Sequence, residues 1–204
     1  MKCVLLEDIA TLRSGFTVRG KVEPMPPDQV TKDHVRLVQM KDLDEYNRFH
    51  LDEVYAVALD NVKQSHYLKS GDVLFRSRGV TNTAVHVGKI PFGLVAASPL
   101  VVIRVEPGVV DPAYLTWYLN YPGQRQISPL SSGTSVPNVT VSGLKGLEIP
   151  LPPLATQRAI ADLADLGQQE QTLMAELADK RQTYLHALLS RCALGQTKLG
   201  ALAQ

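Results

Sequence analysis

The middle of the chain alternates short apolar runs with turn residues, a pattern typical of β-strands. Val73 to Phe75, Ala84 to Ile90 and Leu100 to Val105 are each rich in β-branched residues and bounded by glycine or proline. Leu147 to Leu151 adds one more short strand, which ends in a proline-rich turn. These runs predict a β-rich domain built from short strands.

One helix is predicted between the last two of these strands. Asp111 is a favourable N-cap, Pro112 suits the first helical position, and Pro122-Gly123 ends the helix. The apolar side chains that share one helical face are Tyr114, Leu115, Tyr118 and Leu119. Residues 128–143 follow; they are rich in Ser and Thr and hold no charged residue, so we expect a long polar loop there.

The chain changes character after Pro153, since no proline occurs from Leu154 onward. Apolar residues recur there at spacings of three, four and seven, which predicts a long amphipathic helix with one apolar stripe. The positions expected to face a partner helix are Leu163, Leu166, Glu170, Leu173, Leu177, Lys180, Tyr184 and Leu188. The expected fold class is α+β, with a mixed β-rich domain over 1–152, a coiled-coil spacer helix over 153–192 and a tail over 193–204.

Composition and charge narrow the classes of function. A chain of 204 residues that is 45% hydrophobic can bury a sizeable core. Its net charge of +1 argues against proteins that hold nucleic acid or a membrane surface by bulk charge. Only residues 71–150 lean positive, with 6 basic against 4 acidic residues, so an anionic partner should meet a local patch. The two cysteines form no CxxC pair, and no apolar run approaches the roughly 18 residues of a membrane helix; we expect a cytoplasmic protein.

Motifs of catalysis and of metal or cofactor binding are not found. No lysine follows an acidic residue by two positions, no histidine pair has zinc-site spacing, and GxSxG, Walker A and GxGxxG are absent. Asp111 to Tyr114 reads Asp-Pro-Ala-Tyr, which resembles the Asp-Pro-Pro-Tyr of amino-methyltransferases but lacks its second proline. A helix cap followed by a buried aromatic is the favoured interpretation. We therefore expect no catalysis, no metal and no cofactor.

Polar and basic residue types that contact base edges and phosphates occur in three segments. The first is the glycine-containing loop SGFTVRGK, the second is the turn after Phe75, and the third is the charge-free segment. The candidate DNA-binding residues are Arg19, Lys21, Arg76, Arg78, Asn82, Thr83, Ser132, Thr134, Ser135 and Asn138.

The order of these features resembles one half of the specificity subunit of type I restriction-modification systems, over about residues 5–190. The segments that carry the resemblance are LEDIATLRSGFT, GDVLFRSRG, LVAASPLVVIRV, DPAYLTWYL, SSGTSVPNVTVSGLKGLEIPLPPLATQRAI and the final amphipathic helix. The most specific part is LKGLEIPLPPL, Leu144 to Leu154, with Gln157 and Ile160.

The resemblance implies a target recognition domain that reads one half of a split DNA sequence, followed by a spacer helix. It also implies no catalysis of its own. The implied partners are double-stranded DNA, an adenine methyltransferase subunit and, in systems that cleave, a restriction and translocation subunit. An alternative stays open, in which the chain is an assembly module that acts through its helix and binds no DNA. A methyltransferase using Asp111 to Tyr114 is a more distant alternative.

Family subunits usually hold two recognition domains and two helices, so the resemblance implies that two copies pair through their helices. Such a homodimer would favour an interrupted palindromic site. An antiparallel pair that crosses near Ala175 would place each Glu170 opposite Lys180 of the other chain. This charge pair is our hypothesis for the register of the two helices.

Overall fold

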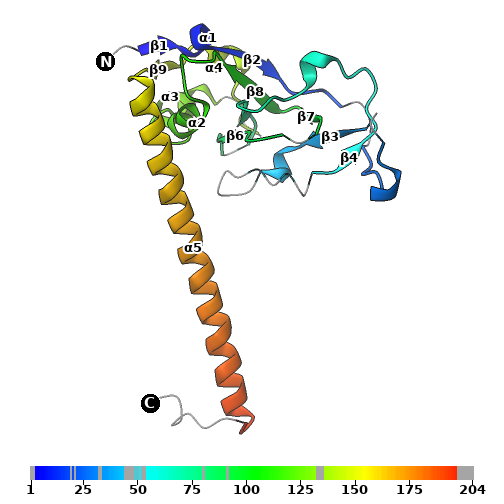
Figure 1. The fold of residues 1–204 in the computed structure, drawn as a ribbon, viewed down its shortest axis with the longest axis vertical. Helices are drawn as coiled ribbons and strands as arrows, with labels where there is room; N and C mark the ends of the chain where they lie inside the picture. The colour runs from blue at the N-terminus through cyan, green and yellow to red at the C-terminus, as the bar shows by residue number, and fades with distance from the viewer. Residues whose placement is uncertain are drawn as a thin grey trace. The chain divides into compact units, whose positions relative to one another are not determined.

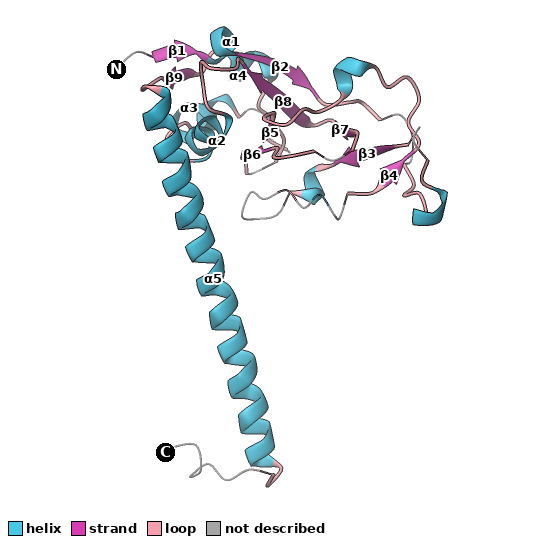
Figure 2. Cartoon of the chain, in the orientation of Figure 1, coloured by secondary structure: helices cyan, strands magenta, loops and turns pink. Residues whose placement is uncertain are grey.

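The structure is a computed structural model, and it divides into two units. One extends to Ala161 and the other begins at Asp162. Figure 1 follows the chain through both units, and Figure 2 marks their helices and strands. The residues that the structure describes are 3–18, 20, 22–31, 34–43, 49, 51, 54–79, 81–90, 92–131 and 136–196.

A four-stranded antiparallel sheet forms the centre of the first unit, in the order β2-β8-β5-β6. Its strands are β2 (Ala10–Ser14), β8 (Leu100–Val105), β5 (Val73–Arg76) and β6 (Ala84–His86). The predicted strands at 73–75 and 100–105 are thus confirmed. The predicted run from Ala84 to Ile90 is strand only as far as His86, although the Val87 amide still donates to the carbonyl of Asp72 at 2.8 Å.

The two faces of this sheet are both buried, which explains why its strands read as continuous apolar runs. Because successive side chains of a strand point to opposite faces, Val73 and Phe75 pack into one core and Leu74 into another. The first core also holds apolar residues of the helices that follow in sequence, and the second holds residues of a separate sheet. The central sheet is therefore the middle layer of the unit.

The separate sheet has three strands, in the order β4-β3-β7. They are β3 (Val35–Val38), β4 (Ala56–Val57) and β7 (Leu94–Ala96); β3 is antiparallel to β4 and parallel to β7. Its outer face packs a third cluster with Phe16, Val18 and Tyr67. Short 3-10 turns flank these strands: η1 (Pro27–Gln29), η2 (Met40–Asp42) and η4 (Gln64–His66).

Short helices and one small sheet cover the other face of the central sheet. The sheet joins β1 (Cys3–Leu5) to β9 (Glu148–Pro150), and the helices are α1 (Leu6–Ile9), α2 (Pro112–Asn120), α3 (Gln124–Ile127), the 3-10 turn η5 (Ser128–Leu130) and α4 (Val141–Lys145). The predicted helix after Asp111 is confirmed, and all four of its predicted apolar residues are buried. The predicted loop over 128–143 is wrong at both ends. It starts with η5, and α4 begins at Val141 because the Thr140 hydroxyl accepts a hydrogen bond from the Gly143 amide.

The long predicted helix is also confirmed. Helix α5 runs from Leu154 to Ala193, and its first two turns, to Ala161, belong to the first unit. Within those turns Gln157 and Ala161 are buried. Of the predicted apolar positions beyond them, Leu188 is half-buried and the others are exposed: Leu163, Leu166, Leu173, Leu177 and Tyr184. The fold class is therefore α+β with a long C-terminal helix. In the part of the chain that the structure describes, no helix is long and apolar enough to cross a membrane.

Candidate nucleic-acid interface

The topology of the central sheet brings the predicted binding segments to one end of it. Strands β2 and β5 flank β8, and both run antiparallel to it. Ser14, the last residue of β2, pairs with Val101, and Arg76, the last residue of β5, pairs with Leu100. The segments that leave these two strands therefore start at the same end of the sheet, on either side of the first residues of β8.

The charge-free segment joins them through backbone pairing with the turn after β5. Arg78 and Asn138 form an antiparallel β-bridge. On either side of it, the Gly79 amide donates to the Pro137 carbonyl at 3.0 Å and the Val139 amide to the Ser77 carbonyl at 2.7 Å. Two segments about 60 residues apart in the sequence are thus held as neighbours.

The segment after β2 packs against the turn that leads into β8. Phe16 bridges to Ala97 in parallel fashion, and the Ser98 amide donates to the Phe16 carbonyl at 2.9 Å. Gly15 permits this approach, because a Cβ there would lie 2.6 Å from the carbonyl carbon of Ala97. The Ser77 hydroxyl donates to the Pro99 carbonyl at 2.5 Å, so the same turn also contacts the segment after β5.

Two of the predicted binding residues lie at the surface of this end. Arg78 is exposed, and Asn138 across the β-bridge is half-buried. Gly79 has a φ of 108°, a conformation that glycine adopts without strain, and it turns the chain directly after Arg78. The exposed guanidinium and the neighbouring amide are the types of group that hydrogen-bond base edges and phosphates.

Two other predicted residues make their contacts inside the protein. The guanidinium of Arg76 donates to the carbonyls of Met40 and Leu43 and so holds β5 to the segment after β3. Asn82 is only 8% exposed; its side-chain amide donates to the Arg76 carbonyl at 3.0 Å, and its backbone carbonyl accepts from the Gln124 side chain at 2.8 Å. The side chains of Arg76 and Asn82 therefore stabilise the turn that carries Arg78.

The remaining predicted residues divide into one described and five undescribed positions. Thr83 is half-buried, and its hydroxyl has no hydrogen-bond partner among the residues that the structure describes. Its backbone carbonyl accepts from the Arg76 amide at 2.8 Å. The positions that lie outside the described residues are Arg19, Lys21, Ser132, Thr134 and Ser135.

A groove of about 1180 Å³ adjoins the segment after β2, and the sequence alone did not indicate it. Ser14, Thr17 and Ser65 contribute hydroxyl groups to its lining. Arg13 also lines it and donates to the His66 carbonyl at 3.0 Å. Burial lowers the pKa of this guanidinium, Arg104 lowers it further, and Asp72 partly opposes them. The signal available in the sequence was the Arg-Ser-Gly run at the end of β2 and just after it, but another wall comes from residues 58–61 and 65–66, which only the fold brings near.

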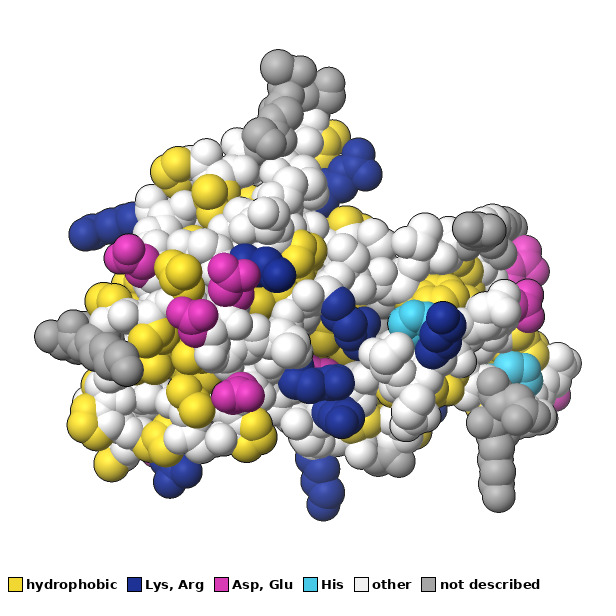
Figure 3. Space-filling view, turned by 90° about the horizontal axis from the view of Figure 1, so that it is seen from above, with side chains coloured by type: hydrophobic (Ala, Val, Ile, Leu, Met, Phe, Trp, Pro, Cys, Tyr) yellow, Lys and Arg dark blue, Asp and Glu magenta, His cyan; other side chains and the backbone are white. Residues whose placement is uncertain are grey.

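Charged side chains of both signs lie at the surface. On the face shown in Figure 3, basic side chains group near the middle, and acidic side chains lie on both sides of them. Where the structure describes the chain, no group of three or more His, Cys, Asp or Glu side chains could hold a metal ion.

The Asp111 to Tyr114 fragment forms a helix cap. The Asp111 carboxylate accepts hydrogen bonds from the amides of Ala113 and Tyr114, at 2.9 and 3.2 Å. Tyr114 is 2% exposed and donates its hydroxyl proton to the Pro150 carbonyl. An aromatic ring buried in this way presents no face for a flipped base, which agrees with the favoured interpretation of this fragment.

Comparison with known proteins connects this fold to DNA recognition. Residues 4–177 match the family model of the type I restriction modification DNA specificity domain. A putative type I restriction enzyme MjaX specificity subunit of Methanocaldococcus jannaschii is 29% identical over 117 residues, which are 52% of this chain and 27% of that protein.

Two solved structures share the fold. The HsdS subunit of Thermoanaerobacter tengcongensis aligns with a TM-score of 0.60 and 18% identity, over 96% of this chain and 45% of that one. The type I restriction-modification S subunit of M. genitalium aligns with a TM-score of 0.55 and 17% identity, over 100% of this chain and 50% of that one. The chain thus spans half or less of each of these relatives.

The family match covers most of the chain, and the chain belongs to the type I restriction-modification DNA specificity domain family. The resemblance stated from the sequence is confirmed, with one DNA specificity domain and one long helix. Domains of this kind recognise DNA and are not themselves catalytic.

Proposed function

We propose that this chain reads one half of a split DNA sequence and directs an adenine methyltransferase subunit to it. In systems that also cleave DNA, it would direct a restriction and translocation subunit as well. The observation that carries the proposal is the meeting of three separate polar segments at one end of the central sheet, held there by backbone hydrogen bonds. Such a subunit works where the chromosome lies, so we propose a cytoplasmic location.

The DNA contacts would come from the surface of that end. Arg78 would take a guanine edge or a phosphate, and Asn138 an adenine edge, while Arg76, Asn82 and Thr83 keep the turn in shape. Residues outside the described part complete the predicted set: Arg19, Lys21, Ser132, Thr134 and Ser135. A good bidentate contact to a base discriminates by about 1–3 kcal/mol, which is roughly a tenfold to hundredfold change in affinity.

Mapping methylated adenines across a genome that carries the chain and its methyltransferase would identify the target duplex. Binding to that duplex is then measured for the methyltransferase complex with the chain and with Arg78→Ala. We expect Arg78→Ala to weaken binding at least about tenfold. Lys89→Ala is the matched control, because Lys89 is also exposed but follows β6 at the opposite end of the sheet. Equal affinities for Arg78→Ala and Lys89→Ala would contradict the proposed interface.

We also propose that two copies pair through α5 as an antiparallel coiled coil. Its apolar stripe is exposed, with Leu163 at 72%, Leu166 at 61% and Leu173 at 64%. Each such leucine gains about 1.5–3 kcal/mol when fully buried, so the stripe favours a partner helix. An assembly module that acts through this helix without reading DNA is the second candidate, and the same stripe supports it.

The charge pattern of α5 favours a second copy of the same helix as that partner. A crossing at Ala175 places Leu173 opposite Leu177 and Leu166 opposite Tyr184, and it joins Glu170 to Lys180 twice. The outer position Leu188 would extend the contact.

Sedimentation equilibrium of Glu170→Lys, Lys180→Glu and the double variant tests this register. Each single change places like charges together at two sites, so we expect dimers about three- to tenfold weaker, and the double change should restore them. Asp179→Lys is the control, because position 179 points away from the stripe. Equal dimer constants for both single variants and the double variant would sink the proposed register.

A further inference from the structure

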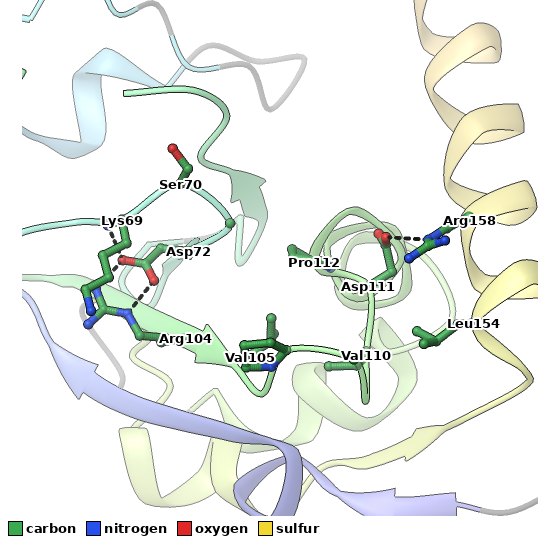
Figure 4. Close-up of a pocket in the computed structure, with 13 residues that line it drawn as sticks. Lys69, Ser70, Asp72, Arg104, Val105, Val110, Asp111, Pro112, Leu154 and Arg158 are labelled. Carbon is green, nitrogen blue, oxygen red and sulfur yellow. Dashed lines mark hydrogen bonds and ion pairs between the residues drawn. The ribbon is translucent and has the colours of Figure 1, made fainter. Parts of the chain in front are cut away.

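A second pocket lies at the other end of the central sheet, with a volume of about 390 Å³. Three segments form its walls: the turn before β5, the link from β8 to α2, and the first turn of α5 (Figure 4). Much of the lining is apolar and comes from Val105, Val110, Pro112 and Leu154.

Three cationic side chains also line this pocket: Lys69, Arg104 and Arg158. No other described residue contacts the ammonium group of Lys69 through a hydrogen bond or an ion pair. Arg158 extends from α5 toward Asp111, and its Nε lies 4.0 Å from that carboxylate, but the side chain is 69% exposed (Figure 4). Both long side chains can therefore turn toward a ligand.

The carboxylates of the pocket are already occupied by protein groups. Asp72 is 1% exposed; it accepts from Nε and Nη2 of Arg104, both at 2.7 Å, and from the Lys69 amide at 2.8 Å. Asp111 caps α2 through the amides of Ala113 and Tyr114. The lining holds three cationic side chains and two carboxylates, and both carboxylates are engaged by protein groups. The pocket therefore has a positive charge that no carboxylate of its lining balances, which favours an anionic ligand.

The position of the pocket separates it from the candidate DNA interface. The interface adjoins Leu100 at the start of β8, whereas the pocket adjoins Arg104 and Val105 at its end. The six residues of β8 put the two ends roughly 17 Å apart, at about 3.4 Å per residue. DNA seated on the loops would leave the pocket open to a different partner.

We propose that this pocket receives an acidic side chain of a protein partner, with an apolar neighbour seated on its floor. Lys69 and Arg158 would pair with the carboxylate, and Val105, Val110 and Leu154 would cover the apolar group. The pocket is then a protein-docking site distinct from DNA recognition.

The binding test uses the full chain and two synthetic peptides, Ac-Leu-Glu-Leu-NH2 and its glutamine analogue Ac-Leu-Gln-Leu-NH2, in an NMR titration. We expect saturable shifts confined to residues 69–72, 104–112 and 154–158, with affinity for the glutamate peptide at least about tenfold higher, because charge-assisted hydrogen bonds are lost with glutamine. No saturable shift, equal affinity for both peptides, or shifts centred on residues 77–79 would each overturn the proposal.

Two variants separate this site from the DNA interface. Lys69→Glu should weaken the glutamate peptide at least about tenfold and leave DNA affinity unchanged, whereas Arg78→Ala should do the reverse. Arg104 is unsuited to the test, because its loss would strand the buried Asp72. If both variants lose peptide binding, or if neither does, the proposed docking site is wrong. The DNA measurement tests the proposed function separately.

Discussion

Gln157 gives the sharpest test of how the first turn of α5 is held in the compact unit. Its side chain is 1% exposed and spans three backbone groups. Its carbonyl accepts from the Asp111 amide at 2.8 Å, and its amide donates to the carbonyls of Pro152 at 2.9 Å and Val109 at 3.4 Å. Gln157→Ala removes all three bonds and leaves their partners unpaired.

Each such hydrogen bond contributes about 0.5–1.5 kcal/mol, so we expect Gln157→Ala to lower the free energy of unfolding by about 2–4 kcal/mol. With a urea slope of about 1–3 kcal/mol per molar, the midpoint should fall by roughly 0.7–4 M. Trp117 is the only tryptophan of the chain and packs against the core beside Tyr114, at 5.7 Å between ring centroids. Its fluorescence therefore reports on the compact unit and not on the exposed length of α5.

The matched control is Gln171→Ala, because Gln171 is an exposed residue of the same helix. Alanine favours the helix slightly more than glutamine, so the control midpoint should stay within a few tenths of a molar. Equal midpoints for Gln157→Ala and Gln171→Ala would refute the reasoning, since they would mean that the three bonds contribute nothing net.

Two further predictions concern Gly15 and the buried tyrosines. Gly15→Ala should lower the free energy of unfolding in urea by about 1–3 kcal/mol and weaken DNA binding, because the alanine Cβ would meet the Ala97 carbonyl. Gly88→Ala is the control, because a Cβ there would meet open space. An equal loss of stability in Gly88→Ala would contradict this prediction. Burial raises the pKa of Tyr114 and Tyr118, so their protonated forms stabilise the fold fully below about pH 10, and that stability is lost as pH rises through the raised values. Thermal melting between about pH 8 and 11 should therefore fall less for Tyr114→Phe than for the unaltered chain, and parallel curves would disprove the coupling.

Local pattern was sufficient for those elements whose signals are themselves local. Asp111 and Pro112 start a helix wherever the chain places them, because the cap bonds to amides two and three residues ahead. The apolar period after Leu154 likewise indicates a helix from its own spacing. The strand from Leu100 to Val105 was predicted to the residue, since it is buried on both faces and reads as one apolar run.

Other elements depend on contacts that no local pattern reveals. The pairing of β3 with β7 joins segments more than 50 residues apart, and β4 is only Ala56–Val57. Asn120 in α2 bonds both the amide and the carbonyl of Ala84, and so occupies the place of a neighbouring strand at that edge. The sequence alone does not indicate that the Asn120 side chain bonds to Ala84.

The candidate site shows the same division. The sequence indicated the residue types and the segments, because the hydrogen-bond donors and acceptors of arginine, asparagine and hydroxyl side chains follow from residue identity. Whether each one faces solvent depended on burial: Arg78 is exposed, whereas Asn82 and Arg76 are engaged within the fold.

By itself, the sequence determined the family, the α+β class and the long helix, since these follow from short motifs and from the spacing of apolar residues along the chain. Only the tertiary structure decided that Arg78 and Asn138 are neighbours, that Gln157 bonds to the helix cap, and that a cationic pocket lies at the far end of the sheet. The physical reason is that these features arise where segments distant in sequence meet, and their geometry comes from the packing of the whole unit.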